Sequence, residues 1–125
     1  MTRRILIVDD DLAMRQMLEV LFRDEGWSAD VAESVDTAVS LLRTGEYGAV
    51  LSDVCMGSRS GLELVGELCR LRPGTPIVLM TAFGGVDSEI EAIRAGAFGY
   101  LSKPFEPEAV LLALESAFEA RATGS

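Results

Sequence analysis

The chain has 125 residues, a length typical of one domain, and 49% of them are apolar, which is enough to form a hydrophobic core. Its formal net charge of −9 would repel phosphate backbones, so direct binding of DNA or RNA by this domain is not expected. The chain contains no histidine, which excludes histidine-based catalytic triads and histidine-ligated zinc sites.

The two cysteines, Cys55 and Cys69, are interpreted as reduced thiols, because a chain with this apolar content does not need disulfides to form a core. The sequence shows neither a secretory signal nor an apolar run as long as a membrane span. We therefore expect a cytoplasmic domain that does not contact a membrane.

Apolar, strand-like runs alternate with amphipathic, helix-like runs along the whole chain. The predicted strands are residues 4–8, 27–32, 49–52, 76–80 and 98–102. A helix is predicted after each strand: from residue 12 to about 25, from 35 to about 44, over 62–71, from about 87 to 95, and from 107 onward. Five strand–helix units of this kind predict a parallel sheet with helices on both faces.

Individual residues indicate where these helices begin, end and face the core. Ser34 is a predicted N-cap, Pro107 a predicted first-turn residue, and Gly26 a predicted C-terminal glycine. The predicted core residues of the first helix are Met14, Met17, Leu18, Leu21 and Phe22. The helix that begins near Asp87 carries Ile90 and Ile93.

The first strand runs directly into three carboxylates, Asp9, Asp10 and Asp11. Like charges at adjacent positions repel, and such groups are commonly held together by a hard cation with oxygen ligands. Asp11 has a simpler role, because the helical pattern begins at the next residue and an aspartate there is a good N-cap. We therefore expect Asp11 to cap the helix and the other two acids to take part in a site.

Three further polar residues follow other predicted strands: Asp53, Thr81 and Lys103, which is the single lysine of the chain. Ligand sites in open parallel sheets lie at the carboxyl ends of the strands, so the fold should bring these residues to Asp9 and Asp10. Three carboxylates, one hydroxyl and one ammonium suit a phosphoryl group together with a divalent cation. Asp53 is the candidate nucleophile, since a carboxylate can form an aspartyl phosphate.

The full motif set resembles the receiver domains of two-component response regulators, which are CheY-like. The resemblance covers essentially the whole chain, with residues 1–122 as the receiver domain and 123–125 as a tail or the start of a linker. It implies a flavodoxin-like, doubly wound, five-stranded parallel sheet of order 2-1-3-4-5 with five helices. The motifs that carry it are Val8-Asp9-Asp10, Leu51-Ser52-Asp53, Met80-Thr81-Ala82 and Lys103-Pro104-Phe105.

The resemblance also implies a function and a set of partners. Asp53 would accept a phosphoryl group from a histidine kinase, a phosphotransfer protein or a small phosphodonor. Asp10, Asp53 and the backbone carbonyl of Cys55 would bind magnesium or manganese, and Asp9 would act through water. The domain would catalyse only its own phosphotransfer and dephosphorylation, in a phosphorelay that regulates an output domain or partner, with phosphorylation-dependent homodimerisation as one outcome.

Three other residues have implied roles in the switch. Thr81 and Lys103 would contact the phosphoryl oxygens, and Tyr100 would change rotamer on activation, remodelling the face formed by the fourth helix, the last strand and the last helix. Structural interpretations stay open beside these: Thr81 as a turn hydroxyl and Tyr100 as ordinary core packing.

Two segments refine the comparison. Residues 81–85 and 95–98 are similar to receivers attached to sigma-54 activators, which take part in transcription regulation. The loop after the candidate acceptor departs from the family, because Gly57 replaces the usual proline and Ser60 the usual acid. Glycine adds backbone freedom where proline removes it. The loop rigidity and phosphate lifetime of the family are therefore not carried over to this chain.

Three alternative functions remain. A flavodoxin-like electron carrier would need a phosphate cradle rich in serine, threonine and glycine after the first strand, where this chain has acids. A phosphatase that forms an aspartyl phosphate would need a substrate pocket. The sequence contains no segment that would form a cap or pocket beyond the strand ends. A degenerate receiver that is never phosphorylated conflicts with the complete set of acids, threonine and lysine.

Overall fold

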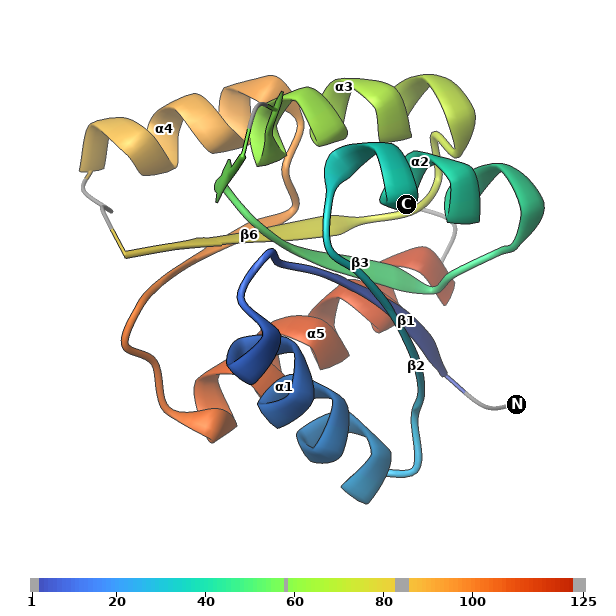
Figure 1. Cartoon of the computed structure of the whole chain (residues 1–125). Helices are drawn as coiled ribbons and strands as arrows, with labels where there is room; N and C mark the ends of the chain where they lie inside the picture. The colour runs from blue at the N-terminus through green and yellow to red at the C-terminus, as the bar shows by residue number, and fades with distance from the viewer. Residues whose placement is uncertain (1–2, 58, 83–85, 123–125) are drawn as a thin grey trace.

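The structure is a computed structural model that describes residues 3–57, 59–82 and 86–122. Its centre is a parallel sheet of five strands in the order β2-β1-β3-β6-β7 (Figure 1). The strands are β1 (Arg4–Val8), β2 (Ser28–Ala32), β3 (Ala49–Asp53), β6 (Ile77–Thr81) and β7 (Gly99–Ser102). Numbered among themselves, they follow the order 2-1-3-4-5, so the predicted doubly wound fold is confirmed.

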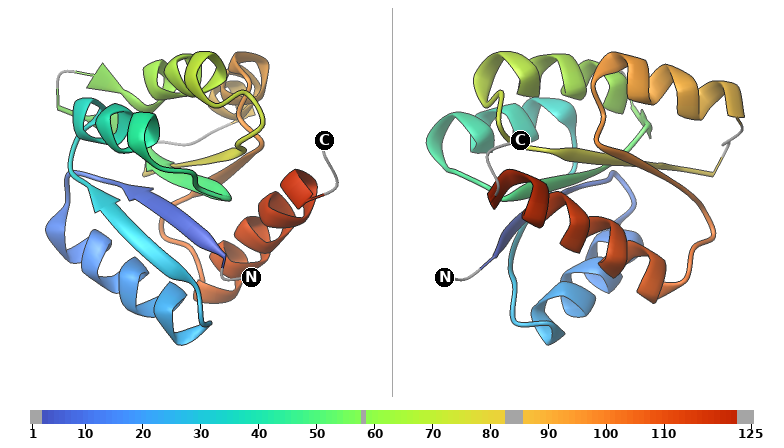
Figure 2. Two further views of the ribbon diagram at one scale, coloured as in Figure 1. Left: turned by 90° about the vertical axis from the view of Figure 1, so that its right-hand side faces the viewer. Right: turned by 180° about the vertical axis from the view of Figure 1, so that it is seen from behind.

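Five helices cover the two faces of this sheet. They are α1 (Leu12–Asp24), α2 (Val35–Thr44), α3 (Gly61–Leu71), α4 (Val86–Ala95) and α5 (Pro107–Ala122). Helices α1 and α5 lie on one face, and α2, α3 and α4 lie on the other (Figure 2). Among the described residues, no helix combines the length and apolar character needed to cross a membrane.

The sheet is buried on both faces, which explains why its strands are uninterrupted apolar runs. In β1, Ile5 and Ile7 join the core beneath α1 and α5, whereas Leu6 and Val8 join the core beneath α2, α3 and α4. Every residue of β3 and β6 is buried. The polar residues at the ends of these strands are therefore held by a rigid scaffold.

Helix ends follow the predicted caps. The Asp11 carboxylate accepts hydrogen bonds from the N–H groups of Ala13 and Met14, at 3.0 and 3.4 Å, and Ser34 caps α2 in the same way. Ser60 is the N-cap of α3, because its hydroxyl accepts from the Glu63 N–H. The serine that replaces the usual acid of the family therefore has a structural role that either residue type can fill.

The segment after β3 differs from the predicted irregular loop. It forms a two-stranded antiparallel hairpin of β4 (Cys55–Met56) and β5 (Arg59–Ser60). Gly57 has φ of +52°, in the left-handed region that glycine adopts without strain and proline cannot reach. This hairpin therefore needs a residue that tolerates positive φ at position 57, and α3 begins at Gly61, one residue before the predicted start.

Two predictions about buried faces were wrong or incomplete. Met17 was assigned to the core side of α1, but 49% of its surface is exposed, and Leu18 and Phe22 provide the buried contacts. Ile90 and Ile93 of α4 are 44% and 47% exposed, whereas the small Ala92 is buried. Residues 83–85, part of the segment compared with receivers attached to sigma-54 activators, lie outside the described residues.

Candidate functional site

Parallel pairing of the strands brings their polar carboxyl ends to one edge of the sheet. Asp53 is level with Met80 of β6, and Thr81 is level with Ser102 of β7. The Lys103 N–H donates to the Thr81 carbonyl at 2.8 Å, which fixes the backbone where the Lys103 side chain departs. Residues separated by up to 94 positions in the sequence are thus in direct contact.

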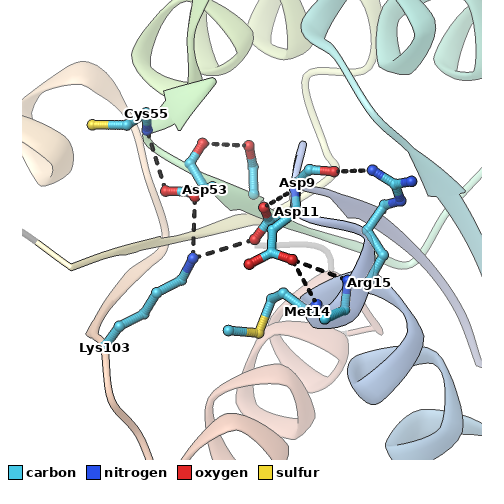
Figure 3. Close-up of polar contacts among 9 residues, drawn as sticks. Asp9, Asp11, Met14, Arg15, Asp53, Cys55 and Lys103 are labelled. Atoms are coloured by element: carbon cyan, nitrogen blue, oxygen red, sulfur yellow. Dashed lines mark hydrogen bonds and ion pairs between the residues drawn. The ribbon is translucent and has the colours of Figure 1, made fainter. Parts of the chain in front are cut away.

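The Lys103 ammonium bridges two carboxylates at the centre of this edge (Figure 3). Its Nζ lies 3.1 Å from Asp53 Oδ2 and 3.3 Å from Asp9 Oδ2. Burial by itself lowers the pKa of Lys103, but the hydrogen bond that Lys103 donates to Asp53 and the charge of Asp9 outweigh that effect and raise the pKa. Lys103 therefore remains protonated and contacts both carboxylates.

Asp9 is fully buried, its backbone N–H donates to the Ala32 carbonyl at 3.1 Å, and three further contacts hold it. Its Oδ1 accepts from the Asp11 N–H at 2.9 Å, its Oδ2 faces Lys103, and its carbonyl oxygen accepts from Arg15 Nη1 at 2.7 Å. Burial raises the pKa of the Asp9 carboxyl, and the Asp11 N–H and Lys103 oppose that rise. Arg15 was not identified from the sequence as a residue that contacts the site. Its position one helical turn after Asp11 would have indicated that it lies near the end of β1.

Asp10 completes an acidic cluster that faces solvent. One carboxylate oxygen from each of Asp9, Asp10 and Asp53 lies within 4.8 Å of the others, close enough for one cation to contact them. Asp9 and Asp53 are buried and Asp10 is exposed, so an ion at this point would retain access to water. Hard oxygen donors with an open side fit magnesium or manganese.

Asp53 is supported by the hairpin that follows it. The Cys55 N–H donates to Asp53 Oδ1 at 3.2 Å, so the two oxygens of the Asp53 carboxylate have different partners. The Cys55 side chain is exposed, and its sulfur points away from the acids (Figure 3). Any role of Cys55 in the site therefore comes from its backbone.

Gly61 is a site residue that sequence reasoning missed. A Cβ atom at this position would overlap the Asp53 carbonyl oxygen and lie 3.1 Å from Val54 Cα. The Gly61 N–H also donates to the Val54 carbonyl at 2.8 Å, which closes the hairpin segment at its base. The start of α3 is thus packed directly on the backbone of the candidate acceptor, and only glycine permits that approach.

Thr81 and Tyr100 lie on the side of the site toward α4. Thr81 is 4% exposed at the end of β6. The Tyr100 ring packs against the core beneath α2, α3 and α4, and its hydroxyl is buried without a hydrogen-bond partner among the described residues. Both residues line one cavity, which places them in a common environment.

Comparison with known proteins gives a consistent result. A family model described as "Response regulator receiver domain" matches residues 5–115. The chain belongs to the response regulator receiver domain family. It is 37% identical over 122 residues to the transcriptional regulatory protein ZraR of Salmonella typhimurium, covering 97% of this chain and 28% of the relative. It is 38% identical over 111 residues to the response regulator protein FleR of Pseudomonas aeruginosa, covering 89% and 24%.

Solved structures agree with this assignment. The beryllofluoride-activated NtrC4 receiver domain dimer is similar with a TM-score of 0.90 and 29% identity, over 94% of this chain and 98% of that chain. The receiver chain spans about a quarter of the length of the curated relatives named above. It is therefore the counterpart of one part of those transcriptional regulators.

Proposed function

We propose that this receiver domain is a phosphorylation-activated switch in which Asp53 accepts a phosphoryl group from a histidine kinase or phosphotransfer protein. The observation that carries the proposal is the position of Lys103. Its ammonium bridges Asp53 and the buried Asp9, which form a cluster of three carboxylates together with Asp10. A cation fixed at this point can neutralise charge on an incoming phosphoryl group.

In the transfer step, an oxygen of the Asp53 carboxylate would attack phosphorus. The new oxygen–phosphorus bond forms as the bond from phosphorus to the donor breaks, and the donor leaves with that electron pair. Lys103 would move its contact from the carboxylates to a phosphoryl oxygen, and Thr81 would bind another. Magnesium or manganese held by Asp10, Asp53 and the Cys55 carbonyl, with Asp9 acting through water, would supply further positive charge.

The proposed output surface is formed by α4, β7 and α5. Large apolar side chains that are exposed on or beside these elements are Ile90, Ile93, Phe98 and Leu112. A shift of Thr81 toward the phosphoryl group, followed by Tyr100, would change the position of α4 and so change this surface. The occupants we propose are a second copy of the domain or an attached output domain of the sigma-54 activator type, because the similar proteins are transcriptional regulators and one solved relative is a dimer.

The alternative functions have less support from the site. The segment after β1 presents carboxylates, not the backbone cradle that an electron carrier needs for a flavin phosphate. We propose that the domain acts on no external substrate, catalyses only its own phosphotransfer and dephosphorylation, and works in the cytoplasm. The free, exposed state of both cysteines is compatible with that compartment.

The decisive experiment is intact-mass measurement after incubation with an acyl phosphate and magnesium. The native protein should gain one phosphoryl group, and Asp53→Asn should gain none. Asp11→Asn is the matched control, because the Asp11 side chain caps α1, asparagine caps a helix equally well, and the backbone N–H that contacts Asp9 is unchanged. A mass gain that persists in Asp53→Asn would show that another residue is the acceptor.

A further inference from the structure

The orientation of Asp10 in the acidic cluster depends on the backbone of one turn. The Asp10 carboxylate is exposed and lies close to those of Asp9 and Asp53. Within the described part of the chain, no residue forms a hydrogen bond or an ion pair with this carboxylate. The turn of residues 9–11, between β1 and α1, therefore sets where the Asp10 side chain points, and the contacts that hold the turn decide how firmly it does so.

Arg15 of α1 holds this turn at the peptide bond that precedes Asp10. Its Nη1 donates to the Asp9 carbonyl oxygen at 2.7 Å, a length typical of a hydrogen bond from a charged donor. The peptide group is planar, so a bond to its oxygen also restricts the Asp10 nitrogen in the same plane. Lys103 approaches Asp9 from the other side and contacts its carboxylate (Figure 3). Arg15 therefore acts on the backbone that leads to Asp10, whereas Lys103 acts on the Asp9 side chain.

A cation in this place has two opposite effects on a bound metal ion. The charge of Arg15 repels the ion, whereas a fixed turn lowers the entropy cost of bringing the Asp10 carboxylate to the ion. An acid near Arg15 weakens the repulsion. The Glu33 backbone N–H and the Thr37 hydroxyl lower the pKa of the exposed Glu33 carboxyl, and the charge of Arg15 lowers it further. The effect of Arg15 on the turn should therefore be the larger of the two.

We propose that Arg15 is a positioning residue of the divalent-cation site and that it orients the Asp10 carboxylate by holding the peptide between Asp9 and Asp10. The inference rests on the proposed function, in which Asp10 and Asp53 hold magnesium or manganese. It adds that α1 contributes to metal affinity through a residue that does not touch the ion. Removal of the guanidinium should weaken metal binding, although removal of a positive charge by itself would strengthen it.

The test measures Mn²⁺ binding to the unphosphorylated protein by electron paramagnetic resonance of the free ion. Arg15→Met, which keeps a long side chain, should bind Mn²⁺ about fivefold more weakly than the native protein, the effect of one net hydrogen bond. Arg15→Lys, which keeps the charge and a donor, should recover part of that loss. Arg23→Met is the matched control, because it removes an equal charge from α1, where Arg23 pairs with Glu19, and it should not weaken binding.

A double substitution separates the positioning of Asp10 from a general structural effect. Asp10→Ala should bind Mn²⁺ weakly, and adding Arg15→Met should cause no further loss, because the carboxylate that Arg15 orients is gone. A further loss of the same size would overturn the proposed route through Asp10. Unchanged or tighter binding by Arg15→Met alone would overturn the role of Arg15 and leave the metal site of the proposed function intact. Absence of saturable binding by the native protein would contradict that metal site and this inference with it.

Discussion

At the scale of single residues, Lys103 is the side chain that we propose links the site to the switch. Its ammonium contacts Asp53 and Asp9, so the cation is present before any phosphoryl group arrives. Lys103→Ala should fold, with a loss of more than about 1 kcal/mol in the free energy of unfolding, because it leaves the buried Asp9 and Asp53 carboxylates without their cation. It should still bind magnesium, but it should be phosphorylated at least about tenfold more slowly, since one fixed charge is missing.

Lys103→Arg is the informative comparison for this prediction. A planar guanidinium is larger than an ammonium and cannot take the same position between two carboxylates. We expect an impaired response, measured as phosphorylation yield and as hydrogen-exchange protection with beryllofluoride. A response equal to that of the native protein would show a looser site, and an unfolded Lys103→Ala would show that the residue is structural.

Tyr47 belongs to a second polar cluster, formed with Asp30 and Arg4, that is separate from the candidate site. Its buried hydroxyl donates to Asp30 Oδ2 at 2.7 Å, and Arg4 donates to the same oxygen at 2.8 Å. Burial and the Asp30 hydrogen bond raise the pKa of Tyr47 to about 12. The tyrosine of an unfolded chain titrates near pH 10, so the stabilisation that Tyr47 provides is complete below about pH 10 and is lost as pH rises toward 12.

Replacing Tyr47 by phenylalanine tests this cluster. Tyr47→Phe should lower the free energy of unfolding by about 1 kcal/mol at neutral pH, because Asp30 loses one hydrogen bond. Denaturant titrations at several pH values should then show a smaller decline between pH 10 and 12 than in the native protein. Every other ionisable group is the same in both proteins, so the difference between the two curves isolates Tyr47. Parallel curves would contradict the assignment.

At the scale of elements, the β4–β5 hairpin contains Gly57, which stands where the family pattern usually has proline. Arg59 ties it to two helices, with Nη1 at 2.8 Å from Asp36 of α2 and Nε at 2.8 Å from Glu63 of α3. Exposed ion pairs contribute little individually, and a hairpin this short is only marginally stable by itself. The backbone conformation of Gly57 is therefore central to holding Cys55 against Asp53.

Gly57→Pro should disrupt this element. Proline requires φ near −65°, whereas Gly57 has +52°, so the residue that the family often carries cannot be accommodated by this hairpin. We expect a loss of more than about 1 kcal/mol in the free energy of unfolding and slower phosphorylation. Gly57→Asn is the matched control, because asparagine tolerates positive φ and nothing lies within 4 Å of a Cβ there. Equal phosphorylation of the two variants would show that the hairpin does not position Asp53.

At the scale of the whole molecule, magnesium should connect the acidic site to global stability. The cation would relieve repulsion among Asp9, Asp10 and Asp53 and would bind only the folded chain. The melting temperature should therefore rise with magnesium concentration. Asp10→Ala should lose most of that rise, whereas Asp11→Asn should keep it, which controls for general screening of the net charge of −9. An equal rise in all three proteins would rule out a specific site at Asp10.

The sequence by itself determined the order and type of the main elements, because the signals are local. Strands buried on both faces must be continuous apolar runs, and a parallel sheet must gather their carboxyl ends at one edge. The placement of Asp9, Asp53, Thr81 and Lys103 at that edge follows from these two facts. The capping roles of Asp11 and Ser34 also depend only on neighbouring residues.

The tertiary structure alone decided which groups meet and which faces remain open. Lys103 contacts Asp9 and Asp53 because the position of each side chain depends on strand register and not on sequence spacing. Helix α4 buries the small Ala92 and leaves Ile90 and Ile93 exposed, because its packing against β7 and α3 determines which residues are buried. Gly61 became identifiable only when α3 was seen to start against the Asp53 carbonyl, a contact that no local pattern encodes.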